Sequence, residues 1–130
     1  MRDRLIASLL VGFVVATTIS LSSCGSDTTS VAAPLSPQAE EGRHLIETEG
    51  CASCHGAAGQ GVVGPALAGL IDTEVELADG SRVLADEAYL QRAILQPDAD
   101  IRAGFDLAMP NNTLTDDEAA AVVAYLRELP

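Results

Sequence analysis

The sequence predicts a small all-α domain of three main helices, with a short β-hairpin between the first helix and the second. Three observations lead to this class. Three stretches carry apolar residues at helical spacing and begin at residues that cap helices. Only one short stretch alternates polar and apolar residues around a turn. A chain of 130 residues also has room for one small domain.

The first predicted helix covers residues 37–49. Ser36 is a good N-cap, and Pro37 suits the first helical position because its missing N–H would have no partner there. Gly50 ends the helix. Gly42 lies inside it, where glycine costs about 1 kcal/mol relative to alanine. We therefore expect another helix to pass close to Gly42.

The hairpin and the second helix follow each other in the middle of the chain. Residues 73–77 and 81–84 are the predicted strands, and the Asp79-Gly80 pair is the turn between them. Asp86 or a neighbour begins the second helix, which Pro97 ends.

The third helix is predicted by the capping box that runs from Thr115 to Glu118. An amphipathic stripe of apolar residues follows at the helical repeat as far as Leu129. The stretch 97–112 before this helix has no regular pattern, and it carries Met109. We expect it to be an irregular loop.

The N-terminus reads as an export signal over residues 1–23, with a short charged start and an uncharged apolar run over 5–23. Its end, Leu21-Ser-Ser-Cys24, resembles the lipobox of bacterial lipoproteins. That resemblance implies cleavage before Cys24 and lipidation of its thiol. The alternative is an uncleaved transmembrane anchor, because residues 5–23 are just long enough to span a bilayer.

Both alternatives place the folded part on the extracytoplasmic, periplasmic side, tethered to a membrane whose identity stays open. Residues 24–36 are small and polar, which predicts a flexible linker behind the lipidated cysteine. Residues 37–130 form the predicted domain.

The motif Cys51-Ala-Ser-Cys54-His55 offers two thiols and an imidazole close together. A disulfide across two residues closes too small a loop to stabilise much. A zinc site would need further ligands, for which only His44 and carboxylates remain. A redox dithiol would belong in an alternating strand and helix pattern that is missing here. The spacing therefore favours covalent attachment of one haem c, with His55 as an iron ligand.

A cofactor also explains the small predicted core. Tyr89, Phe105 and Tyr125 are the only aromatic residues after the signal, and the chain has no tryptophan. A covalently held haem would fill such a core and cross-link it.

The order of these motifs resembles class I c-type cytochromes. The residues that carry the resemblance are Gly42, Ile46, the C-x-x-C-H motif, Gly64, Pro65, Leu67, Met109, Pro110, Tyr125 and Leu126. The stretch from Glu74 to Arg102, with the following Ala103-Gly-Phe105, is similar to the cytochrome c domain fused to subunit II of bacterial haem-copper oxidases. The chain lacks the copper domain and the paired transmembrane helices of that subunit, and so resembles the module set free.

The resemblance implies a role for each site residue. Cys51 and Cys54 bind the haem vinyl groups, and His55 is the proximal iron ligand. Pro65 offers its backbone carbonyl to the other ring nitrogen of His55. Met109 supplies the distal thioether.

Met109 is also indicated by the residues alone, since it is the only methionine left once the signal is removed. A lone methionine often fills a core, but this one precedes a proline in an irregular stretch. His44 is the only rival ligand, and we expect it at the surface. Two protein ligands leave no open iron position, which favours outer-sphere electron transfer over enzymatic chemistry on a small-molecule substrate.

The net charge adds a prediction about partners. Without residues 1–23 the chain keeps 18 of its 19 acids and 5 of its 7 basic residues, all arginine, which gives −13. Such a field repels nucleic acid and attracts a basic surface on a redox partner. A saline habitat is the alternative explanation for the acidic surface.

The expected function is electron transfer between respiratory complexes, toward a terminal cytochrome oxidase. Three alternatives stay open: an electron acceptor of a periplasmic dehydrogenase, a haem gas sensor in which Met109 dissociates, and a redox dithiol protein without haem.

Overall fold

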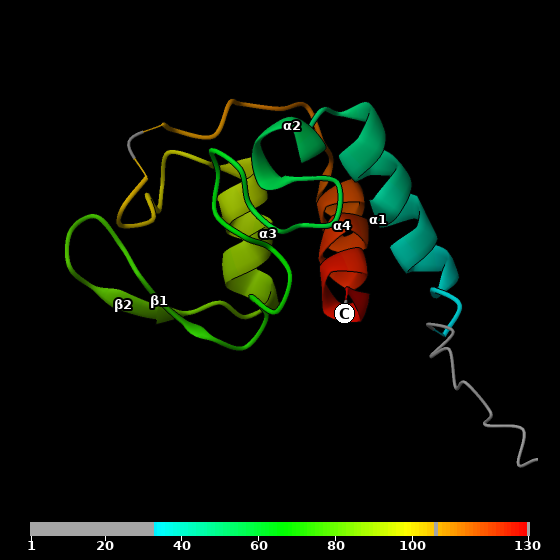
Figure 1. Ribbon diagram of the computed structural model, residues 1–130, viewed down its shortest axis with the longest axis horizontal. Helices are drawn as coiled ribbons and strands as arrows, with labels where there is room; N and C mark the ends of the chain where they lie inside the picture. The colour runs from blue at the N-terminus through cyan, green and yellow to red at the C-terminus, as the bar shows by residue number, and fades with distance from the viewer. Residues whose placement is uncertain (1–32, 106, 130) are drawn as a thin grey trace, which may run out of the picture. The chain divides into compact units, whose positions relative to one another are not determined.

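The computed structural model describes residues 33–105 and 107–129. This part of the chain is mostly helical, with four helices and one antiparallel sheet of two strands (Figure 1). The elements are α1 (Pro37–Thr48), α2 (Ala52–His55), β1 (Glu74–Glu76), β2 (Arg82–Leu84), α3 (Glu87–Leu95) and α4 (Asp116–Glu128).

The three predicted main helices and the hairpin are present, and their caps explain where the helices begin. The Ser36 hydroxyl accepts a hydrogen bond from the backbone N–H of Ala39 at 3.2 Å. Asp86 caps α3 in the same way, and Thr115 opens α4 with a complete capping box. These contacts satisfy backbone donors that have no partner within the first turn of a helix.

Helix α2 was not predicted. It is a single turn inside the C-x-x-C-H motif, and its N-cap residue, Cys51, makes no side-chain capping bond. So short a helix carries no periodic apolar pattern that a sequence reading can detect. Gly56 ends it with a positive φ of 84°, a conformation that glycine adopts without strain.

Helix α1 crosses α4 at Gly42, as predicted from that glycine. A Cβ atom at Gly42 would lie 1.9 Å from the backbone oxygen of Ala121. Apolar residues of both helices form the first core cluster around this crossing: Ala39, Leu45, Ile46, Ala121, Val122, Tyr125 and Leu126.

Helix α4 also reaches a second core cluster through Val123. The second cluster joins α3 to the hairpin, which lies on the side of α3 away from α1 (Figure 1). Strand β1 pairs with β2 so that Val75 faces Val83 and is 3% exposed. The other members are Leu70, Leu77, Ala85, Tyr89 and Leu90.

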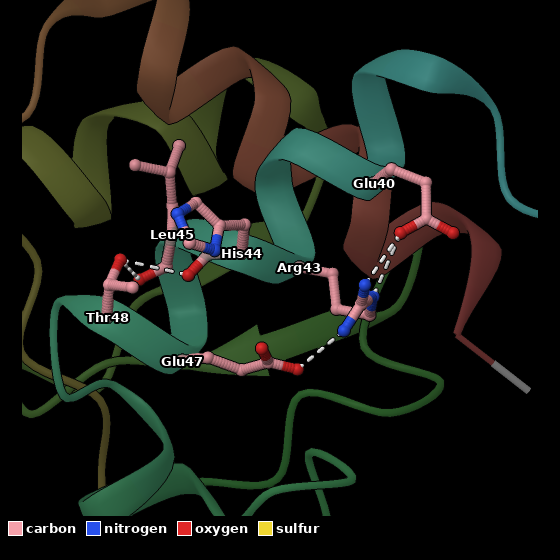
Figure 2. Close-up of polar contacts among 6 residues, drawn as sticks. All are labelled: Glu40, Arg43, His44, Leu45, Glu47 and Thr48. Atoms are coloured by element: carbon pink, nitrogen blue, oxygen red, sulfur yellow. Dashed lines mark hydrogen bonds and ion pairs between the residues drawn. The ribbon is translucent and has the colours of Figure 1, made fainter.

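The outer face of α1 is solvated. Figure 2 shows Arg43 between Glu40 and Glu47, whose carboxylate oxygens lie 2.8 and 2.7 Å from its guanidinium nitrogens. His44 is exposed on the same helix, and its backbone carbonyl accepts a hydrogen bond from the Thr48 hydroxyl (Figure 2). His44 is therefore the surface residue that we expected.

The predicted signal peptide, residues 1–23, and Cys24 lie outside the described residues. Of the predicted linker, 33–36 are described, and Leu35 packs against the first core cluster. No helix within the described ranges is long and apolar enough to cross a membrane.

Candidate haem site

The two thiols of the motif lie on one short turn. Cys51 precedes α2 and Cys54 lies within it, and both are half-buried free cysteines. Burial raises the pKa of the Cys51 thiol, and the nearby Glu49 carboxylate acts in the same direction. The two thiols therefore belong to one short segment, three residues apart.

The imidazole of His55 is held by the chain beyond the motif. Its Nδ1 atom lies 2.8 Å from the backbone oxygen of Pro65, the contact that the resemblance implied. A carbonyl oxygen only accepts, so Nδ1 carries the hydrogen of this bond. The neutral ring then keeps an unprotonated Nε2, which is the form that binds a metal.

The loop after α2 folds back onto the motif and so brings Pro65 to His55. The backbone N–H of Gly61 donates to the carbonyl of His55 at 2.7 Å, and that of Gly64 donates to the carbonyl of Cys54 at 2.9 Å. A Cβ atom at Gly64 would lie only 3.0 Å from Cε1 of the His55 ring. The absence of a side chain at Gly64 therefore lets the loop approach the imidazole.

Met109 lies in the irregular segment between α3 and α4. Asn112 ties the part of this segment that follows Met109 to α3, because its side-chain N–H donates to the carbonyl of Ile94 at 2.7 Å. The Asn112 oxygen accepts from the N–H of Leu114 at 3.1 Å. The sequence reading did not identify Asn112 as an anchor. Its only sequence signal was the position of an asparagine in a loop.

All five predicted site residues of the domain line one cavity of about 240 Å³. Three helices contribute apolar side chains to its wall, including Ile46 from α1, Leu90 from α3 and Leu126 from α4. The members of the predicted set are Cys51, Cys54, His55, Pro65 and Met109. His44, the rival iron ligand, is not part of this lining.

The residues present fit a covalently attached haem. The cavity combines two thiols for thioether bonds, one imidazole of fixed tautomer and one thioether, within a mainly apolar wall. Within 33–105 and 107–129, no three histidine, cysteine, aspartate or glutamate side chains gather as a metal site. A structural zinc finds no ligand set in that part of the chain.

Arg102 is a further polar residue of the cavity lining that the sequence reading did not single out.

A comparison with family models decides the class of protein. The model described as Cytochrome c matches residues 39–130, which include the whole cavity lining. The chain belongs to the cytochrome c family. A search of the curated proteins found no match.

Membership in this family establishes the cofactor. Cytochrome c domains bind haem c covalently through a C-x-x-C-H motif, and Cys51 and Cys54 have that spacing. The protein is a haem-containing electron carrier rather than a catalytic enzyme, and its partners are redox proteins. The closer likeness to the domain of oxidase subunit II stays a prediction.

Proposed function

We propose that this cytochrome is a membrane-tethered carrier that passes single electrons between respiratory complexes, toward a terminal cytochrome oxidase. One observation carries the proposal: His55 and Met109 are far apart in the sequence but line the same cavity. When haem is bound, His55 and Met109 would both be able to hold its iron. An iron without an open position suits outer-sphere electron transfer and not chemistry on a bound substrate.

Bound haem c supplies a one-electron iron couple. The residues around the haem orient its iron ligands and influence its reduction potential. The Pro65 carbonyl orients the His55 ring and strengthens it as a ligand. The Met109 thioether favours the reduced state and so raises the potential. Asn112 holds the segment that carries Met109.

The surface beside the cavity supports transfer to a protein partner. Val63 and Leu107 belong to the cavity lining, yet they are 55% and 64% exposed. Exposed apolar side chains at the edge of a buried cofactor suit a short-lived protein contact. The partner that we propose carries a basic rim, which complements the charge of −13 left by 18 acids and 5 arginines after residue 23.

The dependence of transfer on salt tests this docking model. The rate with a basic redox protein is expected to fall as ionic strength rises, because salt screens the attraction. A rate that rises or does not respond contradicts it.

The membrane tether rests on the sequence of residues 1–24 alone. We propose lipidation at Cys24 on the extracytoplasmic side. A Cys24→Ser variant is expected to lose the lipid and to keep an unprocessed signal, which mass spectrometry of the membrane fraction distinguishes from the mature lipoprotein. If the wild-type chain in the membrane fraction instead has the mass of the full, unprocessed sequence, the uncleaved transmembrane anchor is favoured.

The central test is the visible spectrum of the oxidised protein with haem attached. Iron bound to methionine sulfur gives a weak far-red band in ferric cytochromes of this kind. We expect the band in the wild type and its loss in Met109→Ala, together with a lower reduction potential. Thr113→Ala is the matched control, because Thr113 is an exposed residue of the same segment and is not part of the cavity lining.

A wild-type protein without the far-red band would contradict the proposal. Carbon monoxide binding to the reduced protein would then identify an open position, and the gas sensor would be the better model.

A further inference from the structure

Arg102 differs from the other arginines of the domain. Four arginines have a carboxylate oxygen within 4.0 Å: Arg43, Arg82, Arg92 and Arg127. Arg102 has no such partner among the described residues, although the chain has a large excess of acids. Its Nη1 atom is buried and makes no hydrogen bond within the same part of the chain.

Arg102 as a whole is half-buried, but a buried N–H group without a hydrogen-bond partner is costly, so Nη1 calls for an acceptor. Arg102 lines the same cavity as His55 and Met109. The missing acceptor is therefore expected from the molecule that fills the cavity, and not from solvent.

The hairpin holds Arg102 in this position through the backbone. Arg102 forms an isolated bridge with Leu77, just beyond β1. The N–H of Ala78 donates to the carbonyl of Ile101 at 2.8 Å, and the N–H of Ala103 donates to the carbonyl of Glu76 at 2.9 Å. The guanidinium carbon lies 6.0 Å from the centroid of the Phe105 ring. Backbone pairing and the ring together fix an arginine at the cavity wall.

We propose that Arg102 binds a propionate carboxylate of the haem and sets the charge at that edge of the cofactor. A planar guanidinium matches a carboxylate in shape and charge. The proposal gives the hairpin a role, since its pairing with residues 101–103 positions the arginine. It rests on the covalent haem of the family, and on neither Met109 nor the identity of the redox partners.

Other charged groups near Arg102 have partners of their own. Asp100 accepts a hydrogen bond from Nε of Arg92 at 2.6 Å. Glu76, on the strand beside Arg102, is exposed and lies 3.6 Å from Arg82. Burial of Tyr89, together with the charge of Asp100, raises the pKa of that phenol above its ordinary value. Tyr89 therefore stays neutral at neutral pH, and the propionate is the group expected to titrate.

The test measures the reduction potential of the protein with haem attached, across the mildly acidic to neutral pH range. In Arg102→Gln, the propionate charge loses its partner and favours ferric iron. We expect the ratio of ferric to ferrous protein at a fixed ambient potential to rise about tenfold, which is a fall of about 59 mV for a one-electron couple.

The pH profile separates pairing from a general charge effect. In the wild type, Arg102 holds the propionate ionised. The reduction potential is therefore expected to stay constant across the mildly acidic to neutral pH range. In Arg102→Gln, the propionate pKa rises and the potential falls as pH rises through it. Arg102→Lys keeps the charge and is expected to restore most of the flat profile. If Arg102→Gln fails to fold, the pH profile of Arg102→Lys is compared with that of the wild type instead.

Arg82→Gln is the matched control, because it removes the same charge from an exposed residue of the hairpin. Equal shifts in Arg82→Gln and Arg102→Gln would overturn the proposal, as would a flat pH profile in Arg102→Gln. Asp106 lies outside the described residues and is tested directly. If the effect of Arg102→Gln vanishes in an Asp106→Asn background, Asp106 is the partner and the propionate is not.

The far-red band, read in the same samples, reports Met109 ligation separately. Loss of this band in the wild type would count against the electron-carrier model and would leave the result for Arg102 interpretable.

Discussion

The crossing of α1 and α4 and the wall formed by α3 with the segment 97–114 are built in different ways. At the crossing, Ala39 is fully buried and Ala121 is only 4% exposed, and Gly42 allows backbone contact between the helices. Along the wall, Ile94 and Leu114 are only half-buried, and side chains border a cavity. The protein completes its own packing at the crossing, whereas the cofactor completes it at the wall.

Removal of the haem should therefore weaken the two regions unequally. The double variant Cys51→Ala/Cys54→Ala cannot attach haem covalently. We expect a loss on the order of 2–5 kcal/mol in the free energy of unfolding, the scale seen when a large buried apolar group is removed and leaves a cavity. Amide hydrogen exchange should quicken most in residues 97–114 and least in α1 and α4.

Chemical denaturation and residue-resolved exchange measure the two effects. Equal loss of protection in both regions would contradict the contrast, because the crossing would then also depend on the cofactor.

Gly42→Ala disrupts the close contact between α1 and α4. The added Cβ would lie 1.9 Å from the carbonyl oxygen of Ala121, which is backbone and cannot rotate away. The helices must separate, at a cost of about 3 kcal/mol or more, the upper end of the range for overpacking. Thermal unfolding of the protein with haem attached measures the loss.

Glu41→Ala is the control, since it places the same residue type at an exposed position of the same helix. A stable Gly42→Ala protein with an unchanged melting temperature would mean that the close approach is not required.

Asn112→Ala makes a smaller, local change at the wall. It removes the hydrogen bond to the carbonyl of Ile94, worth about 1 kcal/mol. We expect about a fivefold rise in the population with Met109 released from iron. Faster binding of added imidazole to the ferric protein reports that population.

Thr113→Ala is the matched control for this variant, because Thr113 is an exposed residue of the same segment and does not line the cavity. Equal binding rates in the two variants would show that Asn112 does not anchor the methionine segment.

The sequence predicted features that depend on residues close together in the chain. Ser36, Asp86 and Thr115 cap their helices as expected because each cap bonds to an N–H three residues later. Gly42 marked a close helix approach, since glycine inside a helix otherwise costs stability. The missed helix α2 is too short for its periodicity to be visible in the sequence.

By itself the sequence determined the cofactor chemistry, because Cys51, Cys54 and His55 lie within one turn and need no fold to bring them together. Only the tertiary structure decided which distant residues join them. It placed Met109 at the same cavity, brought the Pro65 carbonyl to His55 and left Arg102 without a carboxylate among the described residues. Such outcomes depend on long-range packing and on how other charges find partners, and neither follows from local spacing.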